Sequence, residues 1–176
     1  MEVSTATSLD MPFILDLYQK AFPAEERKPF SLIERKAAMG YMEILVLKEE
    51  GKRCGFAITA LGQELVLLDY FVISEEYRGQ GLGSDALLLL RELYSDKQFF
   101  LEIEVPDESQ PNARERVRRK NFYLRNGMIE TGIRVSLFHV PLELLAVRPG
   151  LRYEECEEIY REMLGAAYRN MVKKLP

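Results

Sequence analysis

The amino-acid sequence predicts a single α+β domain. A length of 176 residues falls within the usual size of one domain and allows a substantial buried core. Hydrophobic residues make up 47% of the chain and charged residues 30%, a balance typical of globular proteins. Strand-like and helix-like hydrophobic patterns are mixed along the chain, with no internal repeat, low-complexity tract or linker between them. We therefore expect residues 1–176 to fold together as one domain.

The N-terminal region predicts one strand followed by two helices. Residues 2–7 alternate and are rich in β-prone side chains, which favours a strand. Apolar residues at helical spacing predict a helix over 11–22, and either Asp10 or Ser8 can cap its start. A second helix is expected over 31–39.

The middle of the chain predicts three strands and a buried helix. Two strands, 43–48 and 53–60, flank a turn that contains Gly51. A long apolar strand is expected over 64–73. The helix predicted for 84–95 is apolar nearly all round, which is typical of a buried helix.

The C-terminal half predicts further strands and two helices. A strand over 99–105 precedes a basic helix over 112–126, and residues 128–140 form one or two more strands. A last helix is expected over 152–175, because its acidic first turns and basic last turn suit the helix dipole. This helix carries an apolar stripe, which packs either on the chain's own core or at a dimer seam. The stripe consists of Cys156, Ile159, Tyr160, Met163, Ala167 and Met171.

Composition and charge narrow the function classes. The net charge of −4 gives no general signature of polyanion binding, so no nucleic-acid partner is expected. No apolar run is long enough to span a bilayer, and the N-terminus lacks a signal-peptide layout. Cys54, Cys156 and the single histidine, His139, provide neither a disulfide framework nor a metal site. We expect a reduced cytoplasmic protein, with His139 structural and on a strand.

A glycine-rich segment is the strongest functional signal. Residues 77–84 read Tyr-Arg-Gly-Gln-Gly-Leu-Gly-Ser, between the apolar strand and the leucine-rich helix. Glycines can adopt positive φ and bring their amides close to a ligand, and the start of a helix attracts anions. The pattern predicts a pyrophosphate cradle, with an ordinary glycine turn as the alternative. Ser84 stands where a dinucleotide fingerprint needs glycine, and Ser84-Asp85 follows Gly83 where a Walker loop needs Lys-Ser/Thr.

The glycine spacing resembles the acetyl-CoA loop of the GNAT superfamily of N-acyltransferases. A second likeness is Tyr123, followed by Gly127 and Met128, which is similar to the family's Tyr-x-x-x-Gly-Phe signature. The order of the predicted elements also resembles the GNAT fold over about residues 2–140 and leaves the helix at 152–175 outside it. The resemblance implies a mixed, mostly antiparallel central sheet flanked by helices, with an extra C-terminal helix.

This resemblance also implies an activity. The family moves an acetyl group from acetyl-CoA to a primary amine by direct attack in a ternary complex, so the partner would be a small-molecule or peptide amine. The cofactor-binding positions that it implies are Phe71, Val72, Ile73, Arg78, Gly79, Gln80, Gly81, Leu82, Gly83 and Ser84. Tyr123 is implied as the general acid for the departing thiolate, the alternative being a tyrosine that packs its ring on the sheet. Arg116 stands where many members carry a cofactor-binding asparagine, so Asn112, Arg116 or Arg119 could make that contact.

The general base is less clearly marked. Glu102 and Glu104 lie in an apolar strand and share one face by the strand period, so one of their pKa values would be raised. Glu102 resembles the position where some family members carry a glutamate base. The alternative is a pair of solvent-facing or salt-bridged carboxylates, held by arginines of the next helix. Asp69 either lines a substrate cleft or accepts hydrogen bonds from a loop, and the charged residues 25–27 either face an ammonium-bearing substrate or form a plain surface loop.

Two other functions stay open at this point. A non-catalytic acyl-CoA-binding module, which could regulate a partner through the C-terminal helix, would bind the cofactor without transferring its acetyl group. A nucleotide-binding protein using the same loop would prefer ATP or NAD. The missing Walker lysine and the missing dinucleotide spacing argue against this function.

Overall fold

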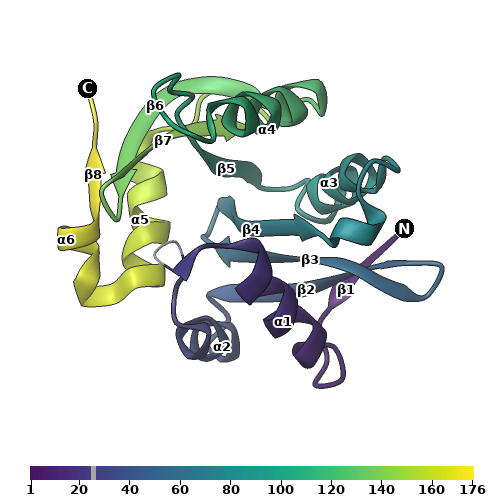
Figure 1. The fold of residues 1–176 in the computed structure, drawn as a ribbon. Coiled ribbons are helices and arrows are strands. Elements are labelled where there is room, and N and C mark those ends of the chain that lie inside the picture. The colour runs from purple at the N-terminus through teal and green to yellow at the C-terminus, as the bar shows by residue number, and fades with distance from the viewer. Residues whose placement is uncertain (25–26) are drawn as a thin grey trace. The chain divides into compact units, whose positions relative to one another are not determined.

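The computed structural model describes residues 1–24 and 27–176, whose strands form a mixed sheet of eight strands flanked by helices (Figure 1). This confirms the predicted fold class. The chain divides into two compact units, the first made of Met1–Leu61 and Leu68–Tyr94, the second of Gly62–Leu67 and Ser95–Pro176. Strand β4 contributes residues to both units.

The first unit contains the elements predicted for the N-terminal half, with small shifts at their ends. They are β1 (Glu2–Thr5), α1 (Met11–Ala21), α2 (Phe30–Ala38), β2 (Met42–Glu49), β3 (Lys52–Leu61), the larger part of β4 (Leu65–Ile73), the 3₁₀ helix η2 (Glu75–Tyr77) and α3 (Leu82–Leu93). The strand order is β1-β2-β3-β4, and both β1–β2 and β2–β3 are antiparallel.

Helices of the first unit pack on its strands through two apolar clusters. Tyr18 of α1 contacts the ring of Phe56 on β3, with centroids 6.3 Å apart, and the ring of Tyr70 on β4 at 4.9 Å. Leu82 and Ala86 of α3 pack in a separate cluster with Leu47 and Cys54. Burial of these apolar side chains is the main stabilising contribution to the unit.

A buried carboxylate, Asp10, ties the start of α1 to the strands. It accepts hydrogen bonds from the backbone N–H of Thr7 at 2.9 Å, from the Thr7 hydroxyl at 2.7 Å and from Arg53 Nε at 2.7 Å. Its side chain is 2% exposed, and Lys48 Nζ lies 3.6 Å away. The Thr7 hydroxyl, the Thr7 N–H and the Arg53 guanidinium together hold the pKa of Asp10 well below its usual range.

We predict that Asp10→Asn lowers the free energy of unfolding at pH 7 by about 2 kcal/mol, because charge-assisted hydrogen bonds are lost. The lowered pKa means that the native carboxylate stays ionised after the unfolded one has become protonated. Its contribution is therefore present above the unfolded pKa of about 4 and is lost as the pH falls. Urea unfolding at pH 7 and at pH 3 should show the gap between wild type and variant shrinking at pH 3. An equal gap at both pH values would contradict the assignment.

The second unit contains the remaining strands and helices. They are β5 (Gln98–Glu104), α4 (Ala113–Arg125), β6 (Ile129–Leu137), β7 (Val140–Ala146), α5 (Tyr153–Leu164), the 3₁₀ helix η3 (Gly165–Ala167), α6 (Tyr168–Met171) and β8 (Val172–Lys174). The order is β5-β7-β6-β8, and all three pairs are antiparallel. Residues 62–67 belong to this unit as well, and Gln98 N–H donates to the Glu64 carbonyl at 2.8 Å.

Two local structures in this unit differ from the sequence prediction. The helix expected over 152–175 ends at Leu164, because Gly165 adopts a φ of 59°, and the chain returns as β8 to pair with β6 (Figure 1). His139 lies in a two-residue turn with Phe138, not on a strand. Both residues have positive φ, 50° and 69°, as a hairpin turn between directly paired strands requires.

Helix α5 is held in the second unit by its apolar stripe. Cys156, Ile159, Tyr160 and Met163 are each at most 2% exposed, so the stripe packs on the chain's own core. Ile159 lies so close to Gly62 that a Cβ on that glycine would come within 3.0 Å of its Cγ1. Among the described residues, no helix combines the length and the apolar character needed to cross a bilayer.

Candidate functional site

The glycine-rich segment of the first unit forms the predicted turn between strand β4 and helix α3. Gly79 and Gly81 have φ values of 78° and 86°, in the left-handed region that favours glycine. Gly81 is the N-cap residue of α3, which therefore begins at Leu82, two residues earlier than predicted. No side chain caps this helix start, so backbone N–H groups of the first turn point out of the helix toward the loop. Such a turn suits an anionic group.

Two side chains of this loop are used to hold its shape. Arg78 Nε donates to the carbonyl of Ile73 at 3.1 Å, and Gln80 Nε2 donates to the carbonyl of Glu76 at 3.1 Å. Both side chains were predicted to bind the cofactor. In this structure each of them closes the turn onto preceding backbone.

The remaining predicted cofactor positions of the first unit anchor the loop. Leu82 is 7% exposed and packs with Leu47 and Cys54, and Phe71 and Ile73 are partly buried against the same cluster. Gly55 permits this arrangement, since a Cβ there would stand 2.3 Å from the carbonyl oxygen of Val72. The first unit thus brings residues 71–73 and 78–84 together on one strand–turn–helix segment.

Tyr123, the predicted general acid, lies on helix α4 of the second unit and is 8% exposed. Its ring stacks edge-on with Phe122 at a centroid distance of 5.1 Å, and its hydroxyl makes no hydrogen bond to any residue that the structure describes. Burial raises the pKa of this phenol to about 12, against an opposing effect of Arg119. The hydroxyl therefore carries its proton throughout the neutral range.

Glu102, the predicted base, accepts a hydrogen bond at Oε1 from the hydroxyl of Tyr160 on α5. Glu102 is half-buried on β5, opposite Leu144 of β7, whereas Tyr160 is fully buried. From the sequence, Tyr160 is predicted only as part of an apolar stripe. The signal that could have singled it out is chemical: a tyrosine in such a stripe needs a partner for its hydroxyl.

Glu104 forms ion pairs with two arginines of α4, which confirms the salt-bridged alternative for this residue. Arg116 Nη2 lies 2.6 Å from Oε1, and Arg119 Nη1 lies 3.3 Å from Oε2. Arg116 also donates to the side-chain oxygen of Asn112 at 2.8 Å and to the carbonyl of Val105 at 3.2 Å. Arg116 and Asn112, two of the three candidates for a cofactor contact from this helix, thus bind each other.

Asp69 accepts a hydrogen bond and forms an ion pair with Lys28, in the loop that precedes α2. Of the two roles expected for this carboxylate, the structure therefore shows contact with a loop. Lys28 Nζ lies 2.7 Å from Oδ1, and the two side chains are 4% and 3% exposed. The ammonium also lies over the Tyr70 ring, 4.9 Å from its centroid. The proposed acidic surface at residues 25 and 26 lies outside the described residues, and Arg27 is half-buried.

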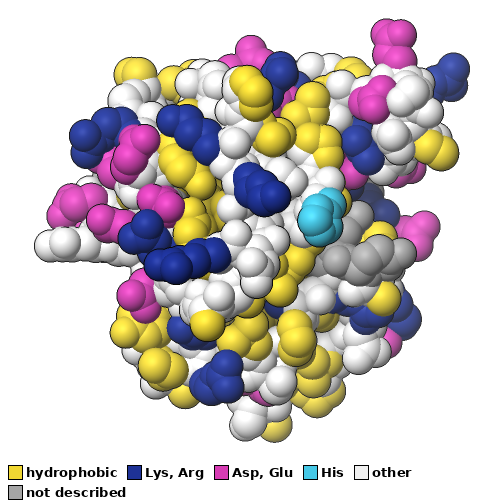
Figure 2. Space-filling model, turned by 90° about the vertical axis from the view of Figure 1, so that its left-hand side faces the viewer, with side chains coloured by type: hydrophobic (Ala, Val, Ile, Leu, Met, Phe, Trp, Pro, Cys, Tyr) yellow, Lys and Arg dark blue, Asp and Glu magenta, His cyan; other side chains and the backbone are white. Residues whose placement is uncertain are grey.

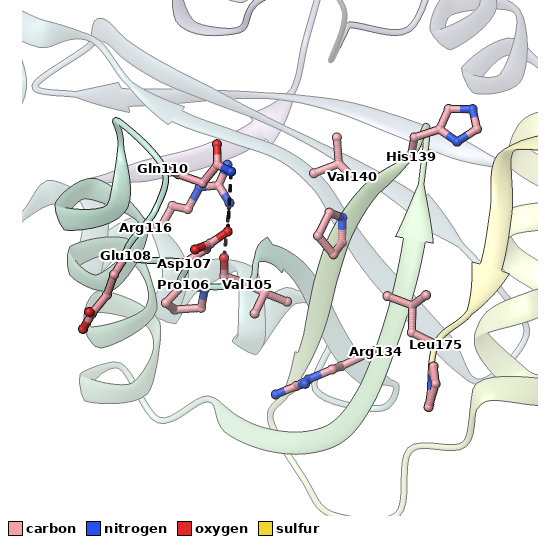
Figure 3. Close-up of a pocket in the computed structure, with 12 residues that line it drawn as sticks. Val105, Pro106, Asp107, Glu108, Gln110, Arg116, Arg134, His139, Val140 and Leu175 are labelled. Atoms are coloured by element: carbon pink, nitrogen blue, oxygen red, sulfur yellow. Dashed lines mark hydrogen bonds between the residues drawn. The ribbon is translucent and has the colours of Figure 1, made fainter.

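The second unit also carries a surface hollow of about 750 Å³ (Figure 3). One wall is the loop after β5, from Val105 to Gln110, and another is formed by His139 and Pro141 at the β6–β7 turn, with Leu175 nearby. Figure 2 shows the single histidine exposed, with basic and acidic side chains interspersed around it. Neither Tyr123 nor Glu102 lines this hollow.

Comparison with known proteins connects these features to one family. The sequence profile described as "Acetyltransferase (GNAT) family" matches residues 11–128. The Bacillus subtilis (strain 168) protein YjbC, whose name assigns it to the acetyltransferases, is 32% identical over 104 residues, which are 59% of this chain. The match spans about half of that protein, 50% of its length.

Solved structures share the fold at low sequence identity. A GNAT-family protein from Bacteroides thetaiotaomicron superposes with a TM-score of 0.74 at 22% identity, over 93% of this chain and 96% of that one. A GNAT acetyltransferase from Elizabethkingia anophelis, solved with acetyl-CoA bound, gives a TM-score of 0.61 at 17% identity, over 84% and 97% of the two chains. The profile match over most of the chain, together with this fold, shows that the chain belongs to the GNAT family of acetyltransferases.

Proposed function

We propose that this protein is an N-acetyltransferase that moves the acetyl group of acetyl-CoA to a primary amine by direct attack. Family membership supports acetyl-CoA as the co-substrate, and a structural relative was solved with it bound. The observation that carries the proposal is the start of α3, which no side chain caps, directly behind Gly79 and Gly81 with their positive φ values. Residues 79–84 would hold the pyrophosphate, and the main chain of residues 71–73 the pantetheine arm.

Each chemical step has a candidate residue in the second unit. The Glu102 carboxylate takes one proton from the acceptor ammonium, and the neutral amine then forms the C–N bond as the C–S bond breaks. The hydroxyl of Tyr123 donates its proton to the departing sulfur, and the second proton that leaves the new amide nitrogen restores that hydroxyl by way of water. Glu102 gives its proton to solvent, so each turnover releases one proton. No covalent intermediate on the protein is needed, and the bound geometry itself contributes a large part of the acceleration.

The activity is tested by mixing the protein with acetyl-CoA and a panel of amines that includes polyamines, aminoglycosides, lysine peptides and peptide N-termini. We expect release of free thiol that depends on one class of amine, with acetylated product identified by mass spectrometry. Calorimetry on the same sample measures binding of acetyl-CoA. Binding without transfer to any amine would favour an acyl-CoA-binding module, and absence of binding would overturn the proposal.

We predict that Gly81→Ala raises the dissociation constant for acetyl-CoA about tenfold to a hundredfold, because the new Cβ keeps the diphosphate from the amides. Apart from the adjoining residues of the chain, no described residue comes within 4 Å of that Cβ, so the cost to folding is limited to backbone strain. Gly40→Ala is a matched control, since Gly40 has a φ of 78° and equally open surroundings after α2. Calorimetry should show weakened binding for the first variant alone, and equal affinities would count against the cradle.

A further inference from the structure

Helix α5, which lies outside the residues matched by the family profile, places one polar group against the predicted base. Tyr160 is 0% exposed, and its hydroxyl donates a hydrogen bond to Glu102 Oε1. The helix can hold this group firmly, because Cys156, Ile159 and Met163 around it are buried as well. The family profile ends at residue 128, so this contact is an addition to the part of the chain that defines the family.

The Tyr160 hydroxyl is a lasting hydrogen-bond donor to Glu102. Burial and the neighbouring Glu102 carboxylate raise the pKa of the Tyr160 phenol well above its ordinary range, so the hydroxyl keeps its proton throughout the neutral range. An O–H donor facing an ionised carboxylate makes one of the stronger hydrogen bonds in proteins. It favours the ionised carboxylate and restricts the rotation of its side chain.

We propose that Tyr160 is a positioning residue that fixes the carboxylate of Glu102 for proton transfer, so that the C-terminal helix forms part of the catalytic apparatus. This inference rests on the proposed function, in which Glu102 takes a proton from the acceptor amine. Tyr160 itself touches no reacting atom and exchanges no proton. Its effect is to hold the accepting carboxylate in one orientation as it takes the proton from the acceptor nitrogen.

Glu104 provides a contrast on the same strand. Its carboxylate is neutralised by Arg116 and Arg119, and its side chain is 12% exposed. Both of its oxygens are therefore engaged by guanidinium groups. Glu102 accepts a hydrogen bond from the neutral phenol of Tyr160, which orients the carboxylate without adding a charge. We therefore keep Glu102 as the candidate base.

The test is a double-mutant cycle with the full chain: Tyr160→Phe, Glu102→Gln and the double variant, assayed with acetyl-CoA and the amine that the panel identifies. We expect each single variant to lose tenfold or more in kcat, with the KM for the amine and the affinity for acetyl-CoA unchanged. The double variant should be no slower than Glu102→Gln alone, because Tyr160 acts only through that carboxylate. Tyr168→Phe, which removes a hydroxyl bound to Glu157 at 2.6 Å, is the matched control and should keep full activity.

The outcomes separate the inference from the function on which it rests. Full turnover by Glu102→Gln would remove the base and with it the proposed mechanism. A defective Glu102→Gln beside a fully active Tyr160→Phe would overturn the positioning role alone. Losses that multiply in the double variant would also overturn it, since Tyr160 would then act elsewhere. Thermal melts check folding. If Tyr160→Phe unfolds, the double variant is still compared with Glu102→Gln, because neither carries the Glu102 charge, and a slower double variant overturns the positioning role.

Discussion

Tyr123→Phe is expected to lower kcat by about 10²-fold or more, the usual contribution of a positioned general acid, and to leave the affinity for acetyl-CoA unchanged. The thiolate that departs from a thioester has no counter-charge of its own and needs a proton from the protein. A phenol with a pKa of about 12 would be a weak acid toward a thiol in water. Burial raises the pKa of a thiol as well as that of a phenol, so proton transfer from Tyr123 to the sulfur becomes less unfavourable in a buried site than in water.

The same pKa gives the prediction a pH signature. Because Tyr123 stays protonated far above neutrality, the ratio of wild-type to variant kcat should be the same at pH 6 and at pH 9. Tyr94→Phe is the matched control, since Tyr94 is 6% exposed and its hydroxyl contacts Thr59 at 2.9 Å. It should lose some stability and no turnover. A Tyr123→Phe enzyme with full turnover on the identified amine would remove the acid role.

The glycine loop could be predicted because its signals are local. Positive φ at Gly79 and Gly81 follows from the residue type. The strand before them and the helix after them follow from the spacing of hydrophobic residues along the chain. The start of α3 at Leu82 was missed by two residues because Gly81 itself caps the helix. The turn at Phe138 and His139 was missed for the opposite reason. Neither residue has a preference for positive φ, and direct pairing of the flanking strands imposes it.

Contacts between distant segments could not be read from the sequence. Tyr160 and Glu102 are 58 residues apart, and Lys28 and Asp69 are 41 apart. In each case the hydrophobic pattern predicts the element and its buried face. The hydrogen bond or ion pair between the two polar side chains depends on how the two segments pack, which the pattern does not give. The C-terminal segment shows the same limit, because the expected helix breaks at Gly165 and residues 172–174 pair with β6 instead of continuing it. Strand pairing of this kind overrides the local helical pattern.

Asp69→Ala should lower the free energy of unfolding by about 3–5 kcal/mol, the cost of leaving a buried charge without its partner. Lys28 Nζ lies 2.7 Å from Asp69 Oδ1, and its side chain is 4% exposed. The backbone of Lys28 is fixed too: its N–H donates to the Tyr70 hydroxyl at 3.0 Å, and its carbonyl accepts from the Tyr18 hydroxyl at 3.0 Å. The backbone of Lys28 is therefore fixed, and its ammonium is held by Asp69 and over the Tyr70 ring.

Urea unfolding at pH 7 measures the effect, and Asp16→Ala is the matched control. Asp16 pairs with Lys20 at the same distance of 2.7 Å, but the two side chains are 62% and 71% exposed, so its loss should cost less than about 0.5 kcal/mol. The double variant Lys28→Met/Asp69→Leu removes both charges and should recover most of the lost stability, because a buried ion pair adds little over apolar packing. If Asp69→Ala costs no more than Asp16→Ala, Lys28 reaches solvent in solution and the ion pair contributes nothing to the fold. If the double variant is as unstable as Asp69→Ala, the loss comes from side-chain packing and not from the stranded charge.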